Sequence, residues 1–148
     1  MATNGYIGPD KVVDDLLVYA WANGFRDAGD DGKFYPSFAV DKINYDFGKN
    51  TFVCKTGTYK WLAIDLFAPM TVNGVEIVEG MDGATLNIEV RVGNTKPPAS
   101  GSTSSVFTFN TLCGNFDGPG TTETNSVINC ASPTEGRFIT LQTKSRYN

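Results

Sequence analysis

The stretch Trp61–Leu66, WLAIDL, decides the fold class. Its residues alternate between two faces, so that Trp61 and Asp65 share one face and aliphatic side chains the other. A period of two residues is typical of a β-strand. The same alternation returns in Ile88–Val92, where charged residues separate aliphatic ones. The pattern predicts an all-β protein with Trp61 in its core, whereas Trp21 fits a core position and a sugar-stacking position equally well.

Turn-forming dipeptides separate the alternating stretches. Glycine and asparagine supply positive φ angles and proline presets φ, so such pairs are typical of turns. They predict strands of about 5 to 7 residues at close spacing, which is the arrangement of an antiparallel sandwich or barrel. Val127-Ile128 and Arg137–Leu141 are interpreted as the last strands. The turn pairs are Ala68-Pro69, Asn73-Gly74, Asp82-Gly83 and Gly93-Asn94.

The length of 148 residues is the usual size of one domain. The Pro-, Gly- and Ser-rich stretch Thr95–Ser105 is a surface loop within that domain, because the strand pattern resumes with Val106. We assign residues 1–17 to an N-terminal extension and residues 18–148 to a single β-sandwich. The pattern of Asp10–Ala22 fits a short amphipathic helix, whereas Val18–Trp21 within it fits a strand equally well.

The composition argues against nucleic-acid and membrane partners. The 12 Lys and Arg residues against 16 Asp and Glu give a net charge of −4, and no basic cluster offers a surface for phosphates. The longest apolar runs, such as Leu16–Ala22, are far shorter than the roughly 20 residues that span a bilayer. Residues 1–5 lack the features of a signal peptide, so we expect that any secretion signal was removed or was never part of this chain.

Catalysis has no support in the sequence. The chain contains no histidine, so a hydrolytic nucleophile would need a carboxylate or a lysine as its base. The acidic pairs Asp14-Asp15 and Asp30-Asp31 lie in loop-like contexts, where solvated acids are the norm. No nucleophile-elbow, P-loop or dinucleotide-binding motif occurs. We therefore expect a binding protein rather than an enzyme.

Cys54, Cys113 and Cys130 bear on the compartment in which the protein works. Cys113 and Cys130 bracket a loop rich in Gly, Asn and Thr, where a disulfide would stabilise the fold by about 3 kcal/mol. Two buried free thiols are the alternative. Cys54 is then left over, which suggests a lost or intermolecular partner in an oxidising compartment. The absence of histidine excludes a mixed Cys/His zinc site.

A set of fragments, in order along the chain, resembles the F-type lectin (fucolectin) branch of the discoidin-like, galactose-binding jelly rolls. The resemblance runs from Tyr19 to Gln142 and implies a single discoidin-like jelly-roll β-sandwich. It also implies that Cys113 and Cys130 form the family's loop disulfide and that the protein is extracellular. The fragments are Tyr35–Asp41 (YPSFAVD), Trp61–Leu66 (WLAIDL), Ile88–Gly93 (IEVRVG), Cys113-Gly114, and Gly136–Leu141 (GRFITL) after Cys130.

The sequence departs from this family at the sugar-binding positions. The family's fucose-binding histidine lies two residues after a cysteine, and Thr56 occupies that position after Cys54. Glu79–Asp82 stands where the family has an Arg-x-Asp motif before the strand that begins at Ile88. Each lost charge-assisted hydrogen bond removes about 1.5–3 kcal/mol. The resemblance therefore implies that free L-fucose binds weakly or not at all.

The resemblance also implies a calcium site and a further strand. Asp41 matches the family's calcium-binding aspartate, so calcium is a candidate cofactor. The family's final strand, which carries a second carboxylate ligand and the partner of Cys54, would begin after Tyr147. We expect the sheet edge that this strand would cover to be closed by Gly5–Leu17 or by a neighbouring chain.

The predicted ligand site lies in the loops at one end of the sandwich, because a rigid sheet presents its binding residues on loops. The loop Ile43–Thr56 carries aromatic side chains that either contact a sugar or pack against the end of the sandwich, and Glu79–Asp82 adds polar ones. The first hypothesis is an extracellular carbohydrate-binding or adhesion module whose partner is a glycan or glycoprotein. The second is a structural subunit of an extracellular assembly, such as a homo-oligomer. The candidate ligand-binding residues are Tyr45, Phe47, Lys55, Thr56, Glu79 and Asp82.

Overall fold

The computed structural model describes residues 12–13, 16–22, 60–78, 87–99, 108–120 and 125–143, and the statements below concern these residues. Every regular element among them is a β-strand, which confirms the predicted all-β class. This part of the chain contains no helix with the length and apolarity needed to cross a membrane. The strands are β1 (Val12–Val13), β2 (Leu16–Leu17), β3 (Tyr19–Ala22), β4 (Trp61–Val78), β5 (Ile88–Gly93), β6 (Thr111–Phe116) and β7 (Asn125–Thr143).

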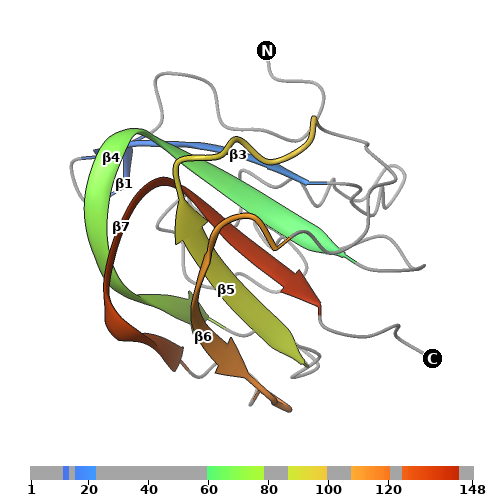
Figure 1. The fold of residues 1–148 in the computed structure, drawn as a ribbon. Helices are drawn as coiled ribbons and strands as arrows, with labels where there is room; N and C mark the ends of the chain where they lie inside the picture. The colour runs from blue at the N-terminus through green and yellow to red at the C-terminus, as the bar shows by residue number, and fades with distance from the viewer. Residues whose placement is uncertain are drawn as a thin grey trace, which may run out of the picture.

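Strands β3 to β7 form one antiparallel sheet in the order β3-β4-β7-β5-β6 (Figure 1). Strand β7, the last in the sequence, lies at its centre. Leu141 of β7 is opposite Leu62 of β4 on one side and opposite Val90 of β5 on the other. Because β7 pairs with both neighbours, its alternation of side chains sets the register of the whole sheet.

Strands β4 and β7 contain 18 and 19 residues, so the prediction of uniformly short strands is wrong for them. The turns predicted at Ala68-Pro69 and Asn73-Gly74 are irregularities within β4, at the register shifts Asp65/Met70 and Val72/Gly74. Proline has no N–H to donate, and a bulge is a place in a strand where none is needed. The two strands predicted at 127–128 and 137–141 are likewise parts of β7. Strands β5 and β6, with 6 residues each, have the predicted length.

The irregularity after Asp65 is the point where β4 bends. Phe67, within it, has a φ of 63°, a left-handed conformation that costs a residue with a Cβ roughly 1–2 kcal/mol. Both β4 and β7 curve here and continue from one layer of the sandwich into the other (Figure 1). The first part of β4 and the last part of β7 therefore belong to the five-stranded layer, and the remaining part of each strand belongs to the second layer. The bend closes one end of the core between the two layers.

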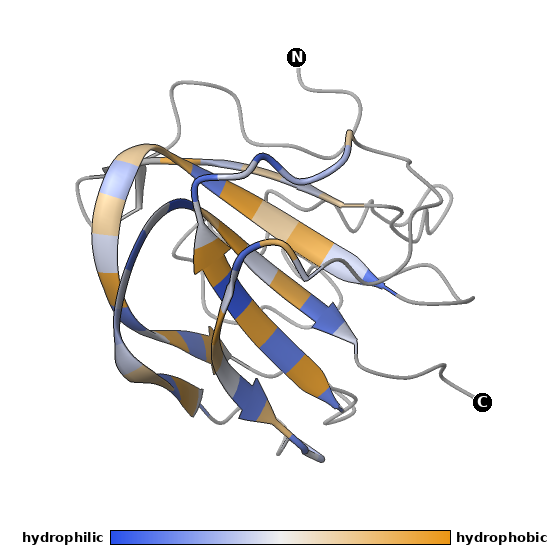
Figure 2. Ribbon diagram, viewed as in Figure 1, coloured by the Kyte–Doolittle hydropathy of each residue, from blue (hydrophilic) through white to orange (hydrophobic). Residues whose placement is uncertain are grey.

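The inner core lies between these two layers. Val90 and Val92 of β5, each fully buried, pack with Ile139 of β7 and with Val72 and Ile128 from the second layer. Apolar and polar residues alternate along β5 (Figure 2), as the period of two predicts. Burial of each such aliphatic side chain stabilises the fold by about 1.5–3 kcal/mol. A smaller cluster beside β3 shares two partly buried residues, Ile64 and Leu66, with this core.

The opposite face of the five-stranded sheet is buried as well. Trp21, Trp61 and Phe138 form an aromatic cluster there, in which the Trp21 and Phe138 rings meet edge to face at 6.3 Å. The indole Nε1 of Trp21 donates a hydrogen bond to the carbonyl oxygen of Pro98 at 2.7 Å. The stretch 94–99 therefore crosses over this face, and both tryptophans are core residues. This confirms the expectation for Trp61 and settles the open choice for Trp21.

The segment Tyr19–Ala22 is strand β3, so of the two readings of Asp10–Ala22 the helix is wrong for these residues. Strand β3 pairs with the beginning of β4, with Ala20 opposite Ile64. Val12–Val13 and Leu16–Leu17 pair with each other in a separate two-stranded sheet. The described part of the N-terminal extension therefore adds no strand to the five-stranded sheet.

A disulfide joins Cys113 of β6 to Cys130 of β7, with Cα atoms 4.1 Å apart, as the family resemblance implied. The two strands lie close at this point, because a Cβ on Gly114 would stand 2.5 Å from the carbonyl oxygen of Asn129. The disulfide thus joins β6, an edge strand of the five-stranded layer, to the part of β7 that belongs to the second layer. Cys54 lies outside the described residues.

Candidate functional site

The chain re-enters the five-stranded sheet at one and the same end after each of the two predicted ligand-binding loops. We call it the Lys60 end. The chain leaves the described sheet at Ala22 and returns at Lys60, beside the last residue of β7. The Thr143 N–H donates to the Lys60 carbonyl oxygen at 2.9 Å, and the Lys60 N–H donates to Thr143 Oγ1 at 3.0 Å. The strand ends at this end of the sheet are Ala22, Trp61, Ile88, Phe116 and Thr143.

The second predicted loop segment returns to the same end. After residues 79–86 the chain re-enters the sheet at Asn87, whose N–H donates to the Asp117 carbonyl oxygen at 3.3 Å. Asn87 has a φ of 50°, a conformation that asparagine tolerates better than most residues. Ile88 then pairs with Thr143, on the side of β7 opposite to Lys60. Strand β7 therefore ends between the return points of both predicted segments.

The candidate residues themselves lie outside the described residues. This holds for every predicted ligand-binding residue and for the predicted calcium ligand, so their contacts stay predictions. The described part of the chain contains no group of three or more His, Cys, Asp and Glu side chains that could hold a metal ion. The residues concerned are Tyr45, Phe47, Lys55, Thr56, Glu79, Asp82 and Asp41.

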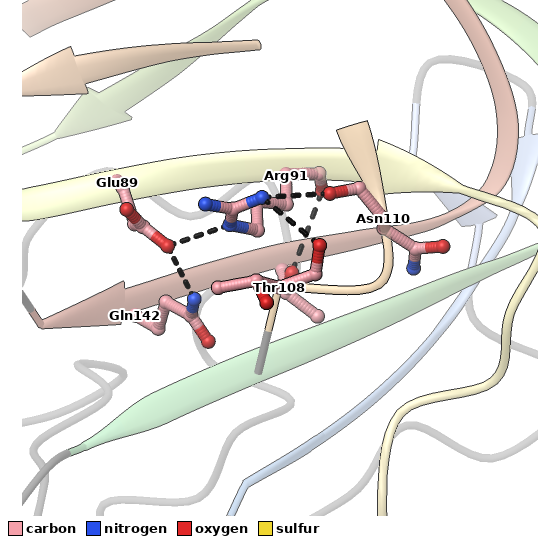
Figure 3. Close-up of polar contacts among 6 residues, drawn as sticks. Glu89, Arg91, Thr108, Asn110 and Gln142 are labelled. Atoms are coloured by element: carbon pink, nitrogen blue, oxygen red, sulfur yellow. Dashed lines mark hydrogen bonds and ion pairs between the residues drawn. The ribbon is translucent and has the colours of Figure 1, made fainter. Parts of the chain in front are cut away.

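A buried polar network on the outer face of the sheet was not predicted from the sequence (Figure 3). Glu89 Oε1 accepts hydrogen bonds from Arg91 Nε at 2.6 Å and from Gln142 Nε2 at 2.5 Å. Arg91 Nη1 in turn donates to the carbonyl oxygens of Thr108, at 3.3 Å, and Asn110, at 2.8 Å. Gln142 is only 1% exposed and Glu89 9%. The only local signal for this network in the sequence is the pair of opposite charges, Glu89 and Arg91, two residues apart on one strand face.

The network fastens the stretch around residues 108–110 to the sheet. The side chain of Asn110 bonds to Thr95 twice, accepting from its N–H at 3.2 Å and donating to its carbonyl oxygen at 2.9 Å. Thr95 and Asn110, on either side of residues 100–107, are therefore held together at the end of β5. Since buried polar groups must be paired, these contacts account for charged residues in a buried strand face. We assign them a structural role.

A second arrangement of polar groups lies at the bend of β4. The carboxylate of Asp65 accepts from Arg137 Nε at 2.7 Å and from Arg137 Nη2 at 2.9 Å, in the bidentate geometry that makes such pairs strong. It also accepts from the Phe67 N–H at 2.8 Å. The hydrogen bond to Asp65 raises the pKa of Arg137 above its ordinary value, so the guanidinium stays charged. Asp65 is buried, whereas the Arg137 side chain is 41% exposed.

The Asp65→Asn variant should lose about 1.5–3 kcal/mol of the free energy of unfolding. The amide keeps one oxygen acceptor but turns an N–H pair toward the guanidinium, so a charge-assisted hydrogen bond is replaced by two opposed donors. Urea denaturation measures the change. Glu76→Gln, which alters an exposed carboxylate bonded to Asn125, is the matched control and should change stability by less than about 0.5 kcal/mol. Equal losses in both variants would contradict a special role for Asp65.

No known protein-family model matches this sequence, and no curated protein matches it. Solved structures do resemble the fold. A fucolectin from the serum of striped bass, Morone saxatilis, is 20% identical with a TM-score of 0.64, over 86% of this chain and 42% of that one. This chain therefore spans less than half of the fucolectin chain.

Bacterial carbohydrate-binding modules are similar to the same extent. The family 32 module of Clostridium perfringens NanJ, solved with galactose, is 16% identical with a TM-score of 0.57, over 86% of this chain and 83% of that one. Chitosan-binding module 2 of a Paenibacillus chitosanase/glucanase, solved with chitotriose, is 14% identical with a TM-score of 0.57, over 87% and 85%. At such identities the likeness establishes the fold alone. It is the discoidin-like jelly-roll β-sandwich that the resemblance to F-type lectins implied.

Proposed function

We propose that this protein is an extracellular, non-catalytic carbohydrate-binding module whose ligand binds at the Lys60 end. The observation that carries the proposal is that the chain re-enters the sheet on both sides of the end of β7, with Lys60 and Ile88 flanking Thr143, after each predicted loop segment. The fold is that of proteins solved with galactose and with chitotriose. A single rigid sheet that anchors several loops at one end is a common way to build such a site.

The candidate residues have the chemistry that a sugar requires. Tyr45 and Phe47 offer aromatic rings for the apolar face of a pyranose. Lys55 and Glu79 offer a donor and an acceptor for hydroxyl groups, with Asp82 as a second acceptor. Calcium at Asp41 stays part of the proposal as an organiser of the loop and not as a reactant. The disulfide Cys113–Cys130 supports an oxidising, extracellular compartment.

Titration calorimetry with galactose, chitotriose and L-fucose tests the proposal. At least one of the first two sugars should bind, and the double variant Tyr45→Ala/Phe47→Ala should weaken that binding by tenfold or more, which corresponds to about 1.4 kcal/mol. Val127→Ser, at a side chain 59% exposed in the second layer, is the matched control and should bind like the unchanged protein. Absence of binding to any glycan on a broad array, together with concentration-dependent self-association, would instead support the structural-subunit hypothesis.

Free L-fucose should bind with a dissociation constant above about 1 mM, because Thr56 and Glu79 stand where the family has its histidine and its arginine motif. Neither side chain supplies the cationic donor that the family uses for the hydroxyl groups. Restoring the histidine with Thr56→His gives a direct comparison in the same calorimeter. Binding of fucose by the unchanged protein well below that concentration would show that the comparison of these positions is wrong.

A further inference from the structure

The bend of β4 exposes a short apolar tip. Phe67, Ala68 and Pro69 are all exposed, and the Phe67 side chain ranks among the large apolar residues left open to solvent, at 42%. A phenylalanine with a φ of 63° is an outlier, because its Cβ crowds the backbone in the left-handed region. Burial does not account for this residue. An exposed aromatic ring held in an unfavourable conformation is a reason to look for a ligand.

The carboxylate of Asp65 holds both the apolar tip and the guanidinium of Arg137 in place. Asp65 Oδ1 accepts from the Phe67 N–H at 2.8 Å and from Arg137 Nε at 2.7 Å, so both donors sit on one anchoring atom. Arg137 also lies over the Phe138 ring, 5.1 Å from its centroid. We call this group, Asp65, Phe67–Pro69 and Arg137, the Phe67 corner. It is rigid, since each polar anchor in it comes from a paired strand.

Arg137 keeps donors available for a further partner. Its Nε and Nη2 bind Asp65, while Nη1 has no partner within the described residues. The side chain is 41% exposed, on the same bend as the Phe67 ring. Because Asp65 neutralises the guanidinium, the corner carries no net charge of its own to attract an anion. An aromatic residue and a neutralised, planar donor that are anchored on the same carboxylate suit a neutral sugar ring, which has one apolar face and hydroxyl acceptors at its edge.

The corner and the Lys60 end are at opposite ends of the same strands. Along β4, Trp61 lies at one end of the five-stranded layer and Asp65 at the other, where it pairs with Phe138. Strand β5 likewise runs from Ile88, opposite Thr143, to Gly93, opposite Phe138. A ligand at the corner therefore contacts different strand ends from a ligand bound at the Lys60 end.

We propose that the Phe67 corner is a second carbohydrate-contact site, in which a neutral pyranose stacks on the Phe67 ring and one hydroxyl accepts from Arg137 Nη1. The proposal takes its ligand class from the proposed function but not its location. A single molecule with sites at both ends of the sheet can bridge two glycans, and the two weak contacts reinforce each other when the glycans are on one surface.

Amide chemical-shift mapping of the ¹⁵N-labelled protein separates the two sites. Titration with methyl β-galactoside, and separately with chitotriose, should shift the amides of Phe67, Ala68 and Arg137 in a saturable manner. Shifts at Lys60, Asn87 and Thr143 report the Lys60 end instead. If the amide signals of the corner shift and those of the Lys60 end do not, the proposed function is wrong in its location and this inference stands. If the corner stays unchanged up to about 50 mM of either sugar, the inference is wrong whatever the Lys60 end does.

The variant Phe67→Gly tests the ring without harming the fold. Glycine adopts the left-handed conformation at no steric cost, so the melting temperature should stay equal or rise, while saturable shifts at the corner should weaken at least roughly tenfold. Phe67→Trp keeps an aromatic face and should retain binding. Val127→Ser is again the neutral control. Unchanged corner shifts in Phe67→Gly would overturn the role of the ring.

Discussion

Replacement of Gly136 by alanine should destabilise the protein by about 3 kcal/mol or more. A Cβ at this buried position would stand 2.4 Å from the backbone nitrogen of Gly93 and 2.6 Å from its Cα. Both contacts are far below the van der Waals limit, and both are to backbone atoms of β5 that no side-chain rotation can move. The strands β5 and β7 must separate at this point, next to the bend of β4.

Urea denaturation followed by tryptophan fluorescence measures this loss, because Trp21 and Trp61 are both buried in the folded protein. Glu135→Ala, at the exposed neighbouring position, is the matched control and should change the free energy of unfolding by less than about 0.5 kcal/mol. A Gly136→Ala protein as stable as the control would show that β5 and β7 lie further apart than this structure places them.

Removal of the Cys113–Cys130 disulfide should cost about 3 kcal/mol. The two cysteines are 17 residues apart, so the bond closes a loop of moderate length and limits the conformations of the unfolded chain. The double variant Cys113→Ala/Cys130→Ala also removes a sulfur atom from the inner core, since Cys113 is 2% exposed. The double variant should therefore lose more of its free energy of unfolding than the unchanged protein loses in reducing agent.

Comparison of those two samples separates the bond from the packing. Denaturation of the unchanged protein with and without a reducing agent gives the contribution of the bond, and the alanine variant adds the missing core atoms. If full reduction, checked by thiol counting, shifts the free energy of unfolding by less than about 0.5 kcal/mol, the disulfide does not constrain the unfolded chain as expected.

Local sequence patterns were sufficient for the fold class. The period of two in Trp61–Leu66 and Ile88–Val92 records which side chains face each layer, and both stretches are strands with the predicted alternation. The disulfide followed from the spacing of fragments shared with F-type lectins. The first of these signals is carried by residues close together in the chain, and the second by the order of fragments along its whole length.

Strand length could not be predicted in the same way. Ala68-Pro69 and Asn73-Gly74 have the residues of turns, and in isolation they would end a strand. In the folded protein β7 runs alongside them and supplies partners on both sides of each irregularity, for example Phe138 for Asp65 and Gly136 for Met70. The hydrogen bonds of a strand that lies far away in the sequence override the local preference.

The same difference between local and long-range information applies to the polar side chains. The alternation of Glu89 and Arg91 with aliphatic residues predicts a strand, but it gives no sign that a crossing segment covers the charged face and that a network pairs these groups there. The pair Asp65 and Arg137 is 72 residues apart and leaves no local trace in the sequence. By contrast, the loop residues Tyr45 and Glu79 are predicted from residue type and from resemblance to a family, and the Tyr45→Ala/Phe47→Ala variant tests the first of them directly.

The central position of β7 has a consequence for biosynthesis. Strand β3 pairs with β4 and β5 with β6, so these two pairs can form as soon as they leave the ribosome. They share no ladder with each other, because β7 lies between them. Until residues 125–143 are translated, the nascent chain holds two separate hairpin-like halves with their apolar faces open. Completion of the sandwich therefore waits for residues 125–143, and chaperones can act on the nascent chain in the interval before these residues emerge.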